Sequence, residues 1–258
     1  MERRTVLQLG AGLTAAAAVG VVGGVAGDRY FSEDNDSGFA VTRQGMGTLG
    51  ARLTVWRGSP DQPIAALTFD DGPTPSYTPH VLKALADADA PATFFMMGKH
   101  VARYPNLARQ VAERHEIGNH SYTHPDMSHA NSTTARDELG RTHKVIEQTT
   151  KKTPVLFRPP YGRFSGALER VAAEMGYTTI LWSDRFHPAS TAEKNVSRLG
   201  KIITSGFIVL CHDGFNSNNK KIIKALPSII KDVRDRGVRF VGVSELLAAM
   251  RQDSGESA

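Results

Sequence analysis

The chain has 258 residues, of which 40% are apolar and 22% charged, and its formal net charge is +5 at neutral pH. This length and composition suit one globular domain with an appended segment. The mild basic excess contains no dense Lys/Arg block, so we expect no nucleic-acid partner. The one cysteine, Cys211, excludes an intrachain disulfide and a metal site built from several cysteines.

Residues 1–27 differ in character from the rest of the chain. Arg3 and Arg4 precede a run of Ala, Gly and Val between positions 11 and 26 that carries no charge. A basic start followed by an apolar run is typical of a targeting segment, and the paired arginines resemble a twin-arginine export signal. We therefore expect a protein that is secreted or associated with the cell wall. It would contact the membrane only through this segment, if the segment is not cleaved.

Residues 28–60 are polar and rich in glycine, and they predict a linker with one short strand around Leu53–Trp56. From Ile64 onward, seven apolar runs alternate with stretches of helical period. The expected strands are 64–69, 92–97, 116–120, 155–160, 178–183, 207–212 and 238–243. The expected helices are 78–89, 106–115, 132–148, 166–176, 192–203, 220–237 and 244–252.

The strands are apolar almost without interruption, which indicates a parallel sheet covered on both faces. Seven β–α units within residues 61–252 favour an α/β fold, a distorted (β/α)7-type barrel of parallel strands. An open, doubly wound sheet is the alternative. Residues 253–258 are expected to form a tail.

Chemically unusual side chains follow five of the predicted strands, at the point where each strand ends. In a parallel barrel the carboxyl ends of the strands share one face, and active sites are built there. The residues concerned are Asp70 and Asp71, His120 and His124, Arg158, Trp182 and Asp184, and His212 and Asp213.

The segment "HSYTH" places His120 and His124 four residues apart, a spacing that on a helical turn puts both rings on one face. Two independent surface histidines are the alternative interpretation. Together with a carboxylate from "FDDG", the two imidazoles suit one Zn²⁺ with an open position for water. One of the two adjacent aspartates would bind the ion, and the other would stay ionised beside it and accept a proton. Other histidines, including His100 and His115, are interpreted as surface or capping residues.

Five segments in this order, "TFDDGP", "ATFFMMG", "HEIGNHSYTHPDMS", "RPPYG" and "IVLCHDG", closely resemble the polysaccharide deacetylases of carbohydrate esterase family 4. The resemblance covers roughly residues 62–250 and includes the nodulation-factor-deacetylase-like domain. It implies a distorted (β/α) barrel that removes N-acetyl groups from N-acetylglucosamine-containing polysaccharide, a chitin-like oligomer or peptidoglycan, and releases acetate. It also implies one divalent cation, zinc or else cobalt or nickel. We expect a monomer.

The resemblance assigns roles to matching positions. The general base is Asp70, the metal ligands are Asp71, His120 and His124, the partner of Asp70 is Arg158, the oxyanion donor and substrate contact is Tyr161, and the general acid is His212. An O-acetyl (xylan) esterase using the same site is the alternative activity. A poorly active glycan-binding wall protein is the alternative from another class.

One segment departs from the family pattern. Members usually carry an Asp-Trp pair after the fifth strand, and here that place holds Pro188 and Ala189. Asp184 is a candidate replacement for the aspartate that tunes His212, and Phe186 or Trp182 for the wall of the acetyl pocket. The alternative is that Asp184 only caps the strand. Cys211 alternates with His212 along its strand, so we expect it to face the helices as a buried, inert thiol.

Overall fold

The computed structural model describes residues 41–44, 52–216 and 219–253. The predicted export signal at 1–27 lies outside these residues, as does the expected tail apart from Asp253. None of the described helices is both long and apolar enough to cross a bilayer.

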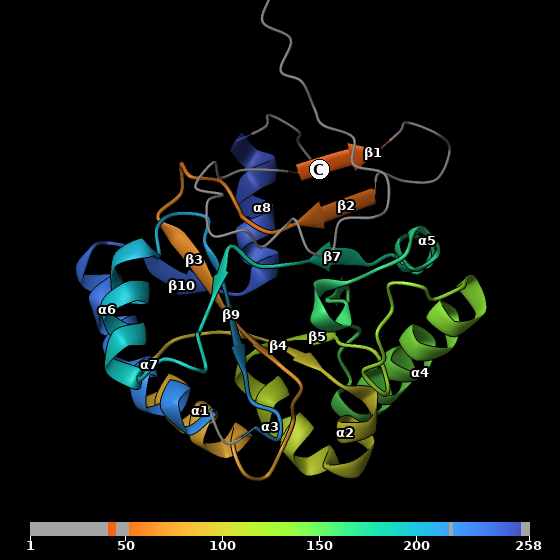
Figure 1. Ribbon diagram of the computed structural model, residues 1–258, viewed down its shortest axis with the longest axis horizontal. Coiled ribbons are helices and arrows are strands. Elements are labelled where there is room, and N and C mark those ends of the chain that lie inside the picture. Colours follow the sequence, from red (N-terminus) through yellow and green to blue (C-terminus); the bar gives the residue numbers. More distant parts are fainter. Residues whose placement is uncertain (1–40, 45–51, 217–218, 254–258) are drawn as a thin grey trace, which may run out of the picture.

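All seven expected strands are present, and they lie in one sheet (Figure 1). They are β3 (Ile64–Asp70), β4 (Thr93–Met96), β5 (Glu116–Asn119), β6 (Leu156–Phe157), β7 (Thr178–Ile180), β9 (Ile208–His212) and β10 (Arg239–Val241). Three short strands complete the sheet: β1 (Val41–Gln44), β2 (Arg52–Val55) and β8 (Asp184–Arg185). The strand expected near 53–56 is β2, which pairs with β7 and so adds part of the 28–60 segment to the sheet.

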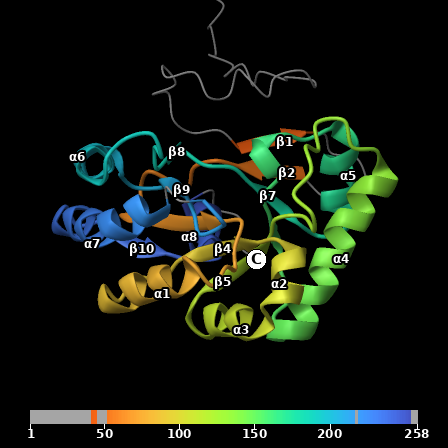
Figure 2. The ribbon, with the colours of Figure 1, turned by 60° about the horizontal axis from the view of Figure 1, so that its bottom comes forward.

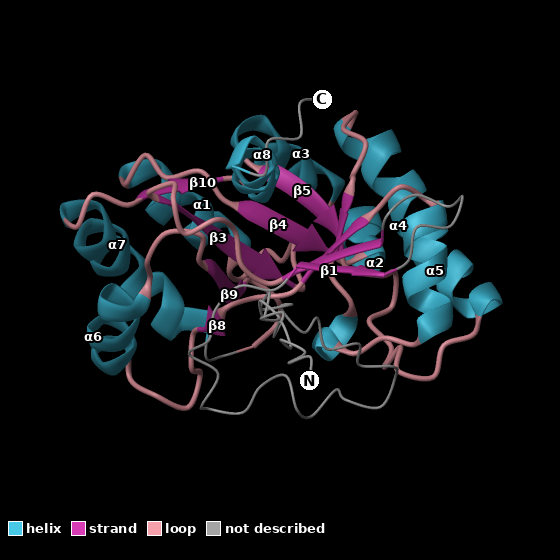
Figure 3. Cartoon of the chain, turned by 90° about the horizontal axis from the view of Figure 1, so that it is seen from above, coloured by secondary structure: helices cyan, strands magenta, loops and turns pink. Residues whose placement is uncertain are grey.

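The sheet order is β1-β2-β7-β6-β5-β4-β3-β9-β8, with β10 on β3, and every pairing except β1–β2 is parallel. The chain after β7 crosses the barrel mouth, because Leu181 N donates to Val55 O and Ser183 N donates to Ile208 O. The following strand, β8, pairs with β9. The sheet therefore curls back on itself, as the view from above shows (Figure 3), and the predicted barrel-type α/β fold is confirmed.

Eight α-helices surround the described part of the sheet, with α6 and α7 on one side and α4 and α5 on the other (Figures 1 and 2). They are α1 (Thr78–Asp87), α2 (Gly98–Arg103), α3 (Pro105–Arg114), α4 (Ser132–Thr150), α5 (Gly166–Glu174), α6 (Ala192–Ile202), α7 (Asn219–Asp235) and α8 (Val243–Asp253), with a 3₁₀ turn η1 (Pro160–Gly162). The sequence did not predict α2, whose six residues are too few to show a helical period. Pro227 lies inside α7, which continues past it.

The strands alternate between two cores. Along β3, Leu67 and Phe69 pack with the outer helices, whereas Ala66 packs inside the barrel with α8. The period of two therefore turns Thr68 and Asp70 inward. The same alternation on β9 places Cys211 in the outer core, fully buried as predicted, and turns His212 inward.

Candidate active site

Three side chains from two strand ends meet at one point of the barrel mouth. Asp71 follows β3, and His120 and His124 follow β5. Asp71 Oδ1 lies 3.4 Å from His120 Nε2 and 3.3 Å from His124 Nε2, and one ligand atom from each residue lies within 4.8 Å of the others. The structure thus brings together the three residues predicted to bind a metal.

The histidine pair reaches this geometry by a different route from the one predicted. Residues 120–124 form a loop, not a helical turn, and Ser121 and His124 have left-handed φ angles of 60° and 64°. The Glu138 carboxylate from α4 holds the loop by accepting hydrogen bonds from Tyr122 N and Thr123 N, each at 2.8 Å. The rings still lie 4.9 Å apart. The buried Glu138 carboxylate, and not a helical turn, therefore holds the segment that brings the two rings together.

The hydrogen bonds of His120 fix which of its nitrogens can bind a cation. His120 Nδ1 lies 2.7 Å from the carbonyl oxygen of Arg158, which can only accept, so Nδ1 carries the proton. In the neutral form of the ring, Nε2 therefore carries the lone pair, and Nε2 is the nitrogen that faces Asp71. Metal-ligating histidines are commonly oriented in this way, by a carbonyl or carboxylate that accepts a hydrogen bond from the other ring nitrogen.

One oxygen of the partly exposed Asp71 carboxylate supports the same conclusion. Its Oδ1 accepts no hydrogen bond although it is shielded from solvent, a condition that is costly unless another partner is present. Burial would raise the pKa of Asp71, but His120, together with His212 and His124, outweighs burial and holds that pKa well below its usual range. Burial would lower the pKa of His120, but the Asp70 and Asp71 carboxylates raise it. The cluster favours a positive charge at its centre, and its residues fit a divalent cation.

Asp70 is held apart from this cluster by Arg158, which reaches across the barrel from the end of β6. Arg158 is fully buried, and its Nη1 donates to Asp70 Oδ1 at 2.8 Å and to Thr68 Oγ1 at 2.7 Å. Its remaining nitrogens donate to the carbonyls of Ile180 and Leu181. Four of the five N–H groups of the guanidinium are therefore engaged, and one Asp70 oxygen is fixed. The other oxygen, Oδ2, faces the cluster, 3.7 Å from His120 Nε2.

Tyr161 borders the cluster, and Trp182 lies near Arg158. The ring of Tyr161 meets the ring of His124 edge-on at 4.6 Å, and the residue is 58% exposed. Its φ of 59° is unusual for a non-glycine residue and marks a strained turn at the site. The Trp182 ring lies 5.7 Å from the Arg158 guanidinium. Both predicted substrate contacts therefore lie at the mouth.

His212 lies beside Asp70, because the two residues are register partners on β9 and β3. Asp184, however, is not beside His212. Asp184 is paired with Val209, three residues earlier on β9, which corresponds to about 10 Å along a strand. Its carboxylate binds the Arg198 guanidinium instead. The structure therefore gives no support to the replacement role considered for Asp184.

Two contributing residues were missed by sequence reasoning. His100, interpreted as a surface residue, is half-buried and bonds the backbone carbonyl of Asp71 through Nδ1 at 2.7 Å. Asp213, noted only for its position, is fully buried and accepts a 2.5 Å hydrogen bond from Thr78 Oγ1. Burial, together with the Asp71 and Asp70 carboxylates, raises the pKa of Asp213 to about 7. The position of Asp213 directly after His212 was the one feature of the sequence that could have indicated it.

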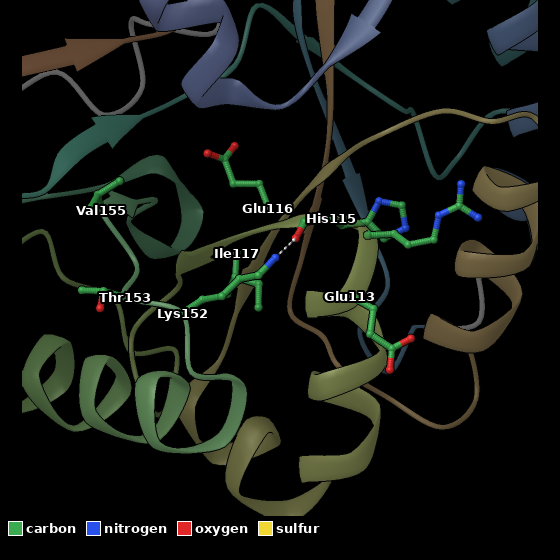
Figure 4. Close-up of a pocket in the computed structure, with 8 residues that line it drawn as sticks. Glu113, His115, Glu116, Ile117, Lys152, Thr153 and Val155 are labelled. Atoms are coloured by element: carbon green, nitrogen blue, oxygen red, sulfur yellow. Dashed lines mark hydrogen bonds between the residues drawn. The ribbon is translucent and has the colours of Figure 1, made fainter.

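A separate hollow lies at the opposite end of β5 (Figure 4). It has a volume of about 380 Å³ and is lined by residues that include His115, Glu116, Lys152 and Val155. Glu116 is already engaged by Thr93 Oγ1 and Ser244 N. His115 is 7% exposed and is the C-cap residue of α3, so of the two interpretations, surface or capping, the structure supports capping. The hollow shares no residue with the cluster around Asp71.

Comparisons with known proteins show which family the chain belongs to. A sequence profile of the polysaccharide deacetylase family matches residues 57–180. Peptidoglycan-N-acetylglucosamine deacetylase from Bacillus cereus is 42% identical over 198 residues, which cover 75% of this chain and 92% of that protein. The chain belongs to the polysaccharide deacetylases of carbohydrate esterase family 4.

Other polysaccharide deacetylases extend the likeness. Chitooligosaccharide deacetylase from Bradyrhizobium is 35% identical over 196 residues, covering 70% of this chain and 89% of that protein. The crystal structure of the Bc1960 peptidoglycan N-acetylglucosamine deacetylase superposes with a TM-score of 0.73 at 27% identity, covering 76% of this chain and 92% of that one. The chain is accordingly a hydrolase that removes acetyl groups from polysaccharide.

Proposed function

We propose that this enzyme uses a divalent cation, zinc, to hydrolyse the N-acetyl groups of N-acetylglucosamine in peptidoglycan and release acetate. The observation that carries the proposal is the Asp71 oxygen that accepts no hydrogen bond and faces two imidazole nitrogens, beside a second carboxylate fixed by an arginine. The choice of glycan rests on the peptidoglycan deacetylase at 42% identity. A chitin-like oligomer is the second substrate to test.

In this proposal Asp71, His120 and His124 hold the cation, and an Asp-His-His donor set suits zinc. When bound, such an ion supplies Lewis acidity next to the reacting carbonyl. Asp70 accepts a proton from the attacking water through the oxygen that Arg158 leaves free. Arg158 keeps that carboxylate in one orientation.

The remaining steps fall to residues on either side of the cluster. The backbone N–H of Tyr161 stabilises the oxygen that becomes negative when water adds to the acetyl carbon. His212 protonates the departing amine, which is a poor leaving group without a proton. The C–N bond then breaks and acetate leaves. No covalent bond to the protein is needed, and Cys211 has no part in the reaction.

One observation favours ester hydrolysis as a second activity. Asp184 binds Arg198 and lies away from His212, so the acid has no carboxylate partner from that segment. An ester releases an alcohol, which departs with less help from an acid than an amine does. Acetylated xylan is therefore included among the substrates to be tested.

The experiment measures acetate release from peptidoglycan, chitooligosaccharides and acetylated xylan with added Zn²⁺ or Co²⁺. Asp70→Asn and His124→Ala are expected to abolish release, and a chelator should do the same. His80→Ala is the matched control, because His80 is an exposed histidine on α1 that is not part of the cluster. Full activity in Asp70→Asn or His124→Ala refutes the assigned roles.

We also propose that the protein acts outside the cytoplasm, since its substrate is a wall polymer and residues 1–27 resemble an export signal. The test is to express the chain with and without residues 1–27 and to locate it by cell fractionation. Retention of the full chain in the cytoplasm contradicts the proposal.

A further inference from the structure

An exposed aromatic ring stands beside the active site and has no role in the chemistry above. Phe215 follows β9 and is 58% exposed. Single exposed apolar residues are ordinary on protein surfaces. Phe215 differs because it belongs to a group of rings that adjoins Asp71.

The group consists of Phe215, Tyr104 and His100, with Arg103 at its edge, and we call it the aromatic shelf. Phe215 and His100 meet edge-on, with ring centroids 5.5 Å apart, and Tyr104 lies 6.3 Å from Phe215. The Arg103 guanidinium lies over the Tyr104 ring at 5.4 Å. Two chain segments more than a hundred residues apart, the end of α2 and the loop after β9, build this surface.

The aromatic shelf is tied to the metal cluster at two points. His100 bonds the Asp71 carbonyl at 2.7 Å. Gly214, the residue before Phe215, packs so closely that a Cβ placed on it would lie 2.3 Å from Asp71 Cβ. The shelf is therefore next to the reacting centre, on the Asp71 side, whereas Tyr161 borders the cluster on the His124 side.

The loop that carries Phe215 is held in place by its own hydrogen bonds. Asn219 Nδ2 donates to the Gly214 carbonyl at 2.6 Å, and Asn216 N donates to the same oxygen at 2.9 Å. An exposed ring on a pinned backbone loses little conformational freedom when a ligand covers it. The Phe215 ring is thus preorganised to contact a ligand.

We propose that the aromatic shelf binds the sugar ring next to the one that is deacetylated, so that the enzyme acts on glycan chains in preference to single sugars; this inference rests on the proposed function. A pyranose ring has an apolar C–H face and a polar rim, which match the face of Phe215 and the donors of Arg103. Because a polymer substrate continues past the reacting unit, the surface adjoining Asp71 is where its next ring lies.

The test compares Phe215→Ala with wild type on two substrates, an N-acetylglucosamine tetramer and the small ester 4-nitrophenyl acetate. The ratio of kcat/KM for the tetramer to that for the ester should fall roughly tenfold, mainly through a higher KM. Phe215→Trp should restore the ratio. Val155→Ala, at an equally exposed apolar residue beside the distant hollow, should leave both values unchanged. An unchanged ratio in Phe215→Ala overturns the inference.

Equilibrium binding of the tetramer separates this inference from the proposed function. If wild type binds the tetramer and Phe215→Ala binds it roughly tenfold more weakly, the sugar-binding role of the aromatic shelf is supported even where no acetate is released. In that case only the proposed function is refuted. If acetate is released but binding does not depend on Phe215, only the shelf fails. A wild type that binds no tetramer refutes the shelf directly.

Discussion

Replacing Gly214 by alanine should weaken metal binding although it replaces none of the proposed ligands. The new Cβ would lie 2.3 Å from Asp71 Cβ and 3.2 Å from Asp71 Oδ2. Carbon atoms pack at about 3.5 Å or more, so Asp71 must retreat by about 1 Å. Its Oδ1 now lies 3.3 and 3.4 Å from the two imidazole nitrogens, and the retreat disturbs both distances at once.

We expect the affinity for Zn²⁺ to fall about 10- to 100-fold, as when a group that orients a metal ligand is changed. The assay is competition with a chelating indicator, supported by the rise in melting temperature that saturating Zn²⁺ produces. Gly140→Ala is the control, because a Cβ there meets nothing within 4 Å. That variant should gain roughly 0.5–1 kcal/mol in α4 and bind Zn²⁺ normally. Unchanged affinity in a folded Gly214→Ala protein refutes the assigned role of Asp71.

Further predictions concern the Arg158–Asp70 pair, His115, the proposed general acid His212, and Asp184. Arg158→Met leaves the buried Asp70 carboxylate without its partner and should lower the free energy of unfolding in urea by about 3–5 kcal/mol; a loss under 1 kcal/mol contradicts the buried pair. Burial lowers the pKa of His115 from 6.5 to about 4, so the unfolded chain takes up this proton first as the pH falls. The neutral His115 stabilises the folded state fully above pH 6.5. Between pH 6.5 and pH 4 this contribution is lost, which lowers the free energy of unfolding by about 2 kcal/mol after allowance for screening. His115→Gln should flatten the pH dependence of the unfolding free energy over this window, and an identical slope in both proteins contradicts the assignment. His212→Ala should reduce acetate release from an amide about 10²- to 10⁴-fold and from an ester much less, whereas equal losses argue against an acid role. Asp184→Asn should change the amide rate less than threefold, since Asp184 contacts Arg198 and not His212, and a large loss would restore the role considered for it.

Local patterns in the sequence were sufficient for the fold and for the metal cluster. Each expected strand is a buried apolar run, and the alternation of inner and outer core along β3 follows from its period of two. Asp71, His120 and His124 meet because parallel strands end on one face. The short α2 escaped detection because six residues show no period.

The supports of the site were beyond sequence reasoning because they come from distant segments. Glu138 on α4 holds the histidine loop, and nothing in its own helix indicates this. His100 reaches Asp71 only because α2 is placed over the end of β3. The strand register does not support the replacement role considered for Asp184: closeness to Trp182 in sequence did not bring it to His212, because β8 pairs with an earlier part of β9.

The central claim is that one divalent ion, held by Asp71, His120 and His124, enables Asp70 to draw a proton from water. The most direct measurement is the metal content of the purified chain, taken together with acetate release from peptidoglycan. We predict about one zinc-class ion per wild-type chain, none retained in His124→Ala, and acetate release that follows the ion. A metal-free wild-type chain that releases acetate at full rate would contradict the account.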